Sequence, residues 1–128
     1  MRFSIFAIVS AIFIPVIAVA AEPNTVDVVM ALFQFPRFDP PSVDINVGDT
    51  VRWTNKGLFP PTVDEGASCL SLVGRQAFKS GFVLPGGIFE HKFDKAGEFS
   101  YVSMPHCFIG TMKGTVSVKE NPTSTNGA

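Results

Sequence analysis

The sequence has almost no excess of charge of either sign, which narrows the classes of partner. Among its 128 residues, 10 are lysine or arginine and 11 are aspartate or glutamate. A nucleic-acid-binding domain or a polybasic membrane contact needs clustered basic residues, and no such cluster is present. The composition therefore predicts no nucleic-acid partner, and no membrane contact after removal of the leader described below.

Motifs of glycosylated proteins and of hydrolases are also missing. The one Asn-x-Thr triplet that resembles an acceptor, Asn121-Pro122-Thr123, carries the excluded proline. No Gly-x-Ser-x-Gly elbow occurs, and no acidic residue near Ser103 and His106 could orient a nucleophile and its base. We therefore predict that the protein is not an enzyme, with an ordinary buried or loop-capping role for Ser103.

The N-terminal segment has the features of a secretory signal. Arg2 supplies the positive start, an apolar run follows, and small residues end it near Ala21. We predict a signal peptide over residues 1–21, a single domain over residues 22–120 and a flexible polar tail over residues 121–128. Export implies a periplasmic or secreted protein.

Only two cysteines are present, Cys69 and Cys107. Because export leads to an oxidising compartment, we predict that they form a disulfide. Closing a loop of about 40 residues would stabilise the domain by ~4 kcal/mol in the chain-entropy model.

Beyond the leader, the patterns are those of strands. Residues 42–47 alternate polar and apolar, Gly48-Asp49 forms a turn and residues 50–54 alternate again, which predicts a hairpin with one buried face. Further strands are expected over residues 25–35, 88–93, 98–101 and 114–118. The regular turns and numerous phenylalanines predict an antiparallel β-sandwich, with Trp53 in its core and a loop holding a short helical turn over residues 64–77.

Several short sequence motifs occur in the order and spacing that are typical of a known family. They are Val47 to Asn55, then Phe89-x-His91-x-Phe93-Asp94-x-Ala96-Gly97-x-Phe99-x-Tyr101, then Met112 to Val116. Over nearly the whole mature chain the sequence resembles the plastocyanin-like cupredoxins, which implies an all-β, Greek-key β-sandwich or barrel. His106-Cys107-x-x-Gly110 also resembles the phytocyanins, in which a Cys directly after a ligand His pairs with an upstream Cys. This resemblance again implies the Cys69–Cys107 disulfide.

The resemblance also implies positions for the four type 1 copper ligands, and two of them are replaced. The first His position holds Pro61 and the Cys position holds Ser103, whereas the second His is kept as His106. The axial Met position is occupied by Met112, which follows His106 by six residues instead of five or fewer. A serine hydroxyl cannot replace a thiolate toward copper, and proline has no side-chain donor, so we predict no blue copper site.

Three functions remain open at this point. We predict foremost a non-blue copper site through His106 and Met112, with Met104 as a further thioether, since imidazole and thioether suit Cu(I). The alternatives are a metal-free interaction module on a cupredoxin scaffold, and the family's single-electron transfer. Each methionine could instead fill a gap in apolar packing. His91 shares strand parity with Phe89 and Phe93, which favours packing over metal binding.

A partner surface is predicted at the end of the sandwich that carries the ligand loops. In cupredoxins the apolar patch around the exposed ligand His is the docking surface for redox partners. The resemblance implies that Phe59, Phe108 and Ile109 lie there, with a periplasmic redox or copper-handling protein as the partner. The alternative is that these residues only seal the end of the barrel.

Overall fold

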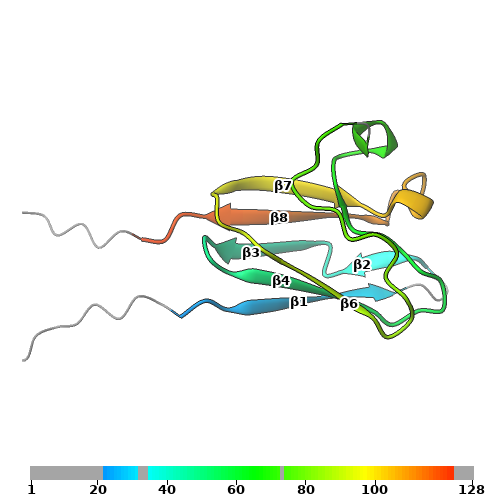
Figure 1. Cartoon of the computed structure of the whole chain (residues 1–128), viewed down its shortest axis with the longest axis horizontal. Helices are drawn as coiled ribbons and strands as arrows, with labels where there is room; N and C mark the ends of the chain where they lie inside the picture. The colour runs from blue at the N-terminus through cyan, green and yellow to red at the C-terminus, as the bar shows by residue number, and fades with distance from the viewer. Residues whose placement is uncertain (1–21, 32–34, 73, 123–128) are drawn as a thin grey trace, which may run out of the picture.

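Two four-stranded sheets pack face to face in this computed structural model, which describes residues 22–31, 35–72 and 74–122 (Figure 1). The first sheet has the order β2 (Arg37–Asp39), β1 (Thr25–Ala31), β4 (Thr50–Asn55) and β6 (Ile88–Lys92). The second has the order β3 (Ser42–Asn46), β8 (Lys113–Lys119), β7 (Gly97–Val102) and β5 (Asp64–Glu65). Two short 3-10 helices, η1 (Cys69–Leu72) and η2 (Met104–His106), are the only helices in these ranges. The predicted all-β sandwich is confirmed.

The strand pairing differs from the prediction in two ways. The sandwich is mixed, since β1 pairs with β4 and β3 pairs with β8 in parallel. The predicted hairpin is wrong, because β3 and β4 belong to different sheets. Gly48 adopts a φ of +95°, and the two carboxylate oxygens of Asp49 accept the backbone N–H groups of Asn24 and Asn46. This turn carries the chain across the sandwich. Alternation identifies each strand's buried face but does not identify its neighbour.

Aromatic side chains fill the space between the sheets. Trp53 on β4 is fully buried, as predicted, with its ring 5.8 Å from Phe78 and 5.2 Å from Tyr101, centroid to centroid. Burial raises the pKa of Tyr101 to about 12, because the charged phenolate would lose its hydration. His91 packs 4.8 Å from the Phe93 ring and 5.0 Å from the Phe78 ring, in agreement with its predicted packing role.

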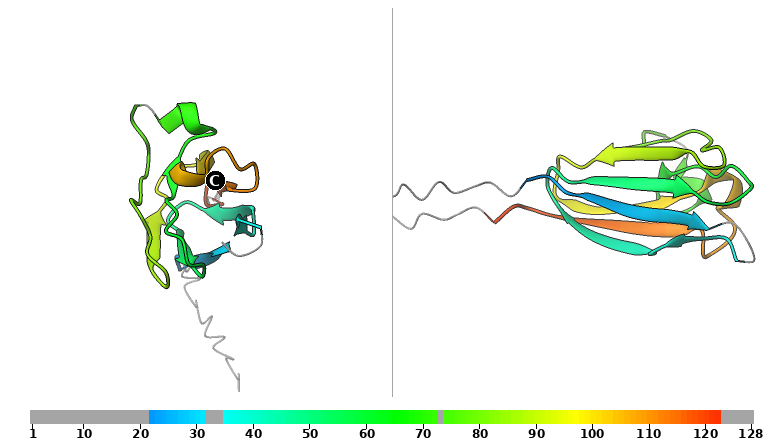
Figure 2. Two further views of the ribbon diagram at one scale, coloured as in Figure 1. Left: turned by 90° about the vertical axis from the view of Figure 1, so that its right-hand side faces the viewer. Right: turned by 90° about the horizontal axis from the view of Figure 1, so that it is seen from below.

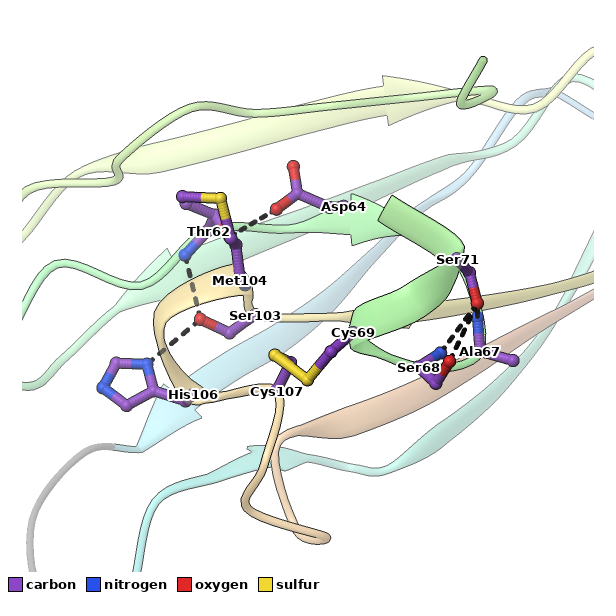
Figure 3. The surroundings of a disulfide bond; sticks show 10 residues. All are labelled: Thr62, Asp64, Ala67, Ser68, Cys69, Ser71, Ser103, Met104, His106 and Cys107. Carbon is purple, nitrogen blue, oxygen red and sulfur yellow. Dashed lines mark hydrogen bonds between the residues drawn. A yellow bond between two sulfur atoms is a disulfide. The ribbon is translucent and has the colours of Figure 1, made fainter. Parts of the chain in front are cut away.

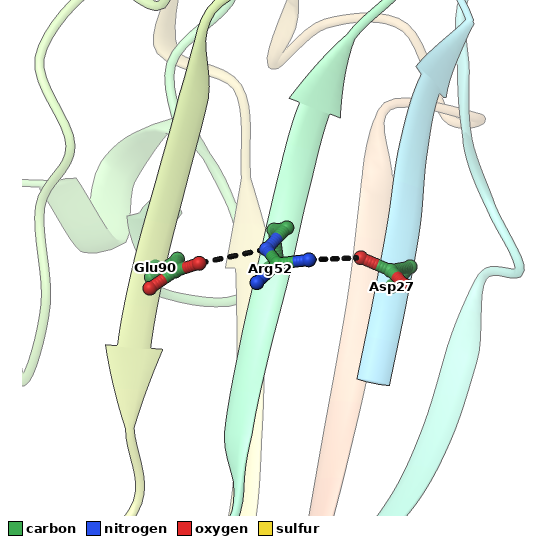
Figure 4. Close-up of polar contacts among 3 residues, drawn as sticks. All are labelled: Asp27, Arg52 and Glu90. Atoms are coloured by element: carbon green, nitrogen blue, oxygen red, sulfur yellow. Dashed lines mark hydrogen bonds and ion pairs between the residues drawn. The ribbon is translucent and has the colours of Figure 1, made fainter. Parts of the chain in front are cut away.

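The outer face of the first sheet is polar. Arg52 on β4 lies between Asp27 on β1 and Glu90 on β6, with N–O distances of 3.6 Å and 2.7 Å (Figure 4). All three side chains are substantially solvent-exposed, so these ion pairs contribute little to stability. Among the described residues, no helix has the length and apolar character needed to cross a membrane.

The strand register gathers four connecting segments at one end of the sandwich, opposite the end where residues 22 and 122 lie (Figures 1 and 2). Ala31 pairs with Arg37, Thr54 with Ile88 and Val102 with Lys113, so the segments that join these strands share that end. We call it the ligand-loop end and define it by residues 35–37, 56–63, 80–88 and 103–113. The far end comprises residues 22–24, 47–49, 93–98 and 119–122.

Candidate functional site

Ser103 lies at the centre of the ligand-loop end. It follows β7 and caps η2 in an extended conformation, and it is 0% exposed. Its hydroxyl accepts the backbone N–H of Thr62 at 3.1 Å and is hydrogen-bonded to Nδ1 of His106, also at 3.1 Å (Figure 3). One hydroxyl therefore connects His106 and its loop to Thr62, which lies 41 residues before Ser103 in the sequence.

The hydroxyl of Thr62 makes a second connection between the same two loops. The hydroxyl of Thr62 donates to Oδ2 of Asp64 at 2.5 Å and accepts the backbone N–H of Met104 at 2.7 Å. Asp64 is buried, and its other carboxylate oxygen has no hydrogen-bond partner among the described residues. Because buried polar groups favour fixed partners, these contacts hold the segment after Pro61 against the start of η2.

The helix η2 sets the position of His106. Pro105 stands in its first turn, where the missing N–H of proline is not needed. The backbone N–H of His106 donates to the carbonyl of Ser103 at 3.0 Å, which turns the imidazole back toward the serine hydroxyl. Partial burial lowers the pKa of His106, since it disfavours the charged ring. His106 is thus a partly buried imidazole whose surroundings favour the neutral ring over the charged one.

The predicted disulfide is present. Cys69 in η1 and Cys107 directly after His106 are bonded, with their Cα atoms 5.3 Å apart, and no described cysteine is free. The residues just before η1 are held by the hydroxyl of Ser71, which accepts the backbone N–H groups of Ala67 and Ser68. Cys107 is therefore occupied by a covalent bond and carries no thiolate for a metal.

The three predicted metal ligands occupy different environments. Met112 is fully buried in the core cluster, and its backbone carbonyl accepts the N–H of Ser103 at 3.3 Å. Met104 is 45% exposed, and Figure 3 shows its thioether on the Thr62 side of Ser103 while the His106 ring extends to the other side. The two thioethers thus differ in burial, and the Met104 thioether lies on the other side of Ser103 from the His106 ring. Metal binding by these residues stays a prediction.

The residues present do not fit a type 1 copper centre. Pro61, at the position predicted for the first His ligand, is buried; its side chain offers no donor and its carbonyl accepts the N–H of Val83 at 2.8 Å. The hydroxyl at the Cys position is neutral, hard and already engaged in two hydrogen bonds. Over the described ranges, no group of three His, Cys, Asp or Glu side chains converges elsewhere to hold a metal ion.

Ser103 and His106 are hydrogen-bonded but do not form a hydrolytic pair. The serine is out of contact with solvent, so its hydroxyl is inaccessible to a substrate in this arrangement. No carboxylate is hydrogen-bonded to His106 in the described chain, whereas an acyl-transfer triad needs one to orient its base. The buried, loop-capping role predicted for Ser103 matches its contacts.

The exposed apolar side chains are concentrated at the ligand-loop end. Of the ten large hydrophobic side chains that are exposed in the described residues, only Leu70 lies elsewhere. Phe108 is 93% exposed and Phe59 is 65% exposed, and Ile109, which follows Phe108 in the sequence, is 38% exposed. The nine are Phe35, Leu58, Phe59, Phe82, Leu84, Ile88, Met104, Phe108 and Ile109, which we call the apolar end patch. Phe59, Phe108 and Ile109 were predicted from the sequence to form a partner surface. The exposed residues of the 80–88 loop were not predicted, because the position of that loop in space depends on the fold.

Comparison with known proteins agrees with this architecture. Residues 29–119 match the family model described as copper binding proteins, plastocyanin/azurin family. Plastocyanin from Scenedesmus fuscus is 37% identical over 89 residues, covering 64% of this chain and 86% of that protein. Amicyanin from Paracoccus versutus is 31% identical over 101 residues, covering 79% and 72%.

Solved structures show the same fold. A Cu(I) form of an amicyanin mutant superposes with a TM-score of 0.58 at 30% identity, over 80% of this chain and 87% of the other. A purple cupredoxin from Nitrosopumilus maritimus superposes with a TM-score of 0.59 over 73% and 98%, and at 24% identity it shares the fold alone. With the family model matching more than half of its length, the chain belongs to the plastocyanin/azurin family of copper-binding proteins.

Proposed function

We propose that this protein is a cupredoxin whose ligand-loop end works without a metal, as a protein-binding surface. The observation that carries the proposal is the pair of hydrogen bonds made by the Ser103 hydroxyl. These bonds link the segment after Pro61, the Cys position and the second His position. In a type 1 site the copper ion ties those positions together. In this protein the hydroxyl of Ser103 connects them by hydrogen bonds instead.

The end loops also have a metal-free source of stability. The disulfide fixes Cys107 to η1, and a loop of 38 residues gives ~4 kcal/mol of stabilisation in the chain-entropy model. Hydrogen bonds contribute about 1 kcal/mol each, and two of them, Thr62 to Ser103 and Met104 to Thr62, hold the two loops together. A fold with these contacts does not depend on a metal for its folding free energy.

The apolar end patch supplies the proposed function. A concentration of exposed apolar side chains on a small protein marks an interaction site, because covering apolar surface with a partner releases ordered water and lowers the free energy of the system. We propose that Phe59, Phe108 and Ile109 contact the partner directly. A redox or copper-handling protein of the periplasm fits the family and the predicted export.

The test is the thermal unfolding of the full mature chain after chelator treatment, with and without one equivalent of Cu(II). A ligand that binds only the native state raises the unfolding midpoint. We expect the unfolding midpoint to be the same with and without Cu(II), both in the natural chain and in a His106→Ala variant. A copper-dependent rise in the natural chain that is lost in His106→Ala would contradict the proposal.

A second candidate is non-blue copper binding through His106 and Met112, with Met104 as an additional thioether. It is favoured by one observation: Ser103 is hydrogen-bonded through its hydroxyl to the His106 ring and through its N–H to the Met112 backbone, which makes the two residues neighbours. Imidazole and thioether are suitable donors for Cu(I). Single-electron transfer, as in the family, would also require this metal.

Anaerobic Cu(I) titration of His106→Ala and Met112→Leu against a competing chelator tests this candidate. Both variants should lose affinity if the two side chains are ligands. Unchanged affinity in His106→Ala would show that the ligand assignment is wrong.

A further inference from the structure

We infer that the apolar end patch binds a protein whose own docking face has an apolar centre and carboxylates around it. The inference rests on the proposed function and adds the charge of the partner. It is carried by the distribution of charged residues between the two ends of the sandwich.

The four segments of the ligand-loop end contain basic residues and no acidic ones, and the carboxylates that border them are already engaged: Asp39 pairs with Arg37, and the buried Asp64 accepts the hydroxyl of Thr62. The basic residues are Arg37, Lys56 and Lys113, all of them exposed. The far end has the opposite balance, with two lysines and five acidic residues in its four segments. They are Lys95 and Lys119 against Glu22, Asp49, Asp94, Glu98 and Glu120. Although the formal charge of the chain is only −1, the molecule is polarised along its length.

Two of the basic side chains are available to a partner. Lys56 directly follows β4, where its N–H donates to the carbonyl of Met30, and Lys113 begins β8 opposite Val102. Neither ammonium group forms an ion pair within the described chain, whereas Arg37 pairs with Asp39 at 3.6 Å. Unpaired charges beside an apolar patch select partners of opposite charge and speed their association.

Other occupants match this surface less well. A second copy placed face to face would bring lysines against lysines, which is unfavourable. A lipid surface attracts basic clusters of about four to eight residues, and this end has three, one of them already paired. An acidic protein surface satisfies both the apolar patch and the two lysines.

The test uses two short peptides of matched length as probes, one alternating phenylalanine and leucine with glutamate and the other with lysine in place of glutamate. Backbone amide NMR shifts of the full mature chain are followed during each titration. We expect the acidic peptide to shift resonances of residues 56–60, 82–88 and 104–113 and to bind at least about tenfold more tightly than the basic one, with the difference reduced at high salt.

Charge-reversed variants provide the controls. Lys56→Glu/Lys113→Glu should invert the preference between the peptides, whereas Lys95→Glu/Lys119→Glu at the far end should leave it unchanged. Equal binding of both peptides at the ligand-loop end would overturn the charge inference but leave the proposed function standing. Absence of shifts with either peptide, or shifts confined to the far end, would contradict both. Binding to phosphatidylserine vesicles, but not to phosphatidylcholine vesicles or to the peptides, would identify a lipid surface instead and overturn the inference.

Discussion

The backbone N–H of Thr62 donates a 3.1 Å hydrogen bond to the hydroxyl of Ser103, 41 residues further along the chain. Both residues are buried, at 2% and 0% exposure. The bond joins the loop after β4 to the loop after β7, beside the positions predicted for two ligands of a type 1 copper ion. It is the contact on which the metal-free account depends.

Replacing Ser103 with alanine should therefore destabilise the protein. The substitution removes the acceptor and leaves the buried N–H of Thr62 without a partner, which costs about 1–3 kcal/mol. The measurement is the free energy of unfolding in denaturant, with Ser68→Ala as a control because the hydrogen bonds of Ser68 are exposed. Equal stability of Ser103→Ala and the natural chain would show that this bond does not hold the loops.

Restoring the two replaced ligands should create a blue copper site. Because Pro61 and Ser103 are predicted to occupy the His and Cys positions, the double variant Pro61→His/Ser103→Cys should show a thiolate-to-copper absorption band with Cu(II). The single variant Pro61→His lacks the thiolate and should show none. A double variant that folds with its disulfide intact, yet gives no band, would mean that these positions do not converge on one point.

Gly114 should not tolerate a side chain. It lies opposite Tyr101 in the β7–β8 pair, and a Cβ atom there would overlap the buried Tyr101 ring. Gly114→Ala should lower the free energy of unfolding by about 1–3 kcal/mol through overpacking. Gly110→Ala is the matched control, since a Cβ at Gly110 meets no atom within 4 Å. Similar stabilities of the two variants would refute the packing described here.

The two histidines should make the protein less stable at acidic pH. Burial lowers the pKa of both His91 and His106 below the ordinary value of 6.5, and Asp94 partly offsets the effect at His91. The unfolded chain then binds protons first as the pH falls. The stability that comes from keeping the two histidine rings neutral is thus fully present above pH 6.5, and it is lost as the pH falls through their folded-state pKa values.

Unfolding free energies measured across this pH range should decrease toward acid, and the decrease should be smaller in His106→Asn. NMR titration of the ring protons reports each pKa directly. A pKa of His106 above 6.5 in the folded protein would contradict the burial of its ring.

Sequence patterns were sufficient for the fold class and for most strands, but not for their arrangement. Alternation located β3, β4 and β6, yet β3 and β4 present the same pattern whether they form a hairpin or face each other from two sheets. Strands as short as β2 and β5 show no period at all. Their positions follow from pairing with β1 and β7, which is a tertiary effect.

The site could be predicted only in part, because some of its contacts also depend on tertiary structure. The spacing of Ser103 and His106 predicted a missing thiolate, which stays a prediction. The presence of only two cysteines, with predicted export, predicted the disulfide, and that prediction is confirmed. The hydrogen bond from Thr62 and the burial of Met112 could not be read from spacing, because they depend on how two loops meet. The exposed Phe82 and Leu84 belong to a loop whose place at this end is set by the pairing of Val83 with Pro61.

The most direct test of metal independence is a copper titration of the purified mature protein, with Cu(II) in air and with Cu(I) under anaerobic conditions against a competing chelator. The account predicts that the protein takes copper from the chelator in neither oxidation state and shows no thiolate-to-copper band. Stoichiometric, tight Cu(I) binding that disappears in His106→Ala would contradict it and would establish a His–Met copper site at this end.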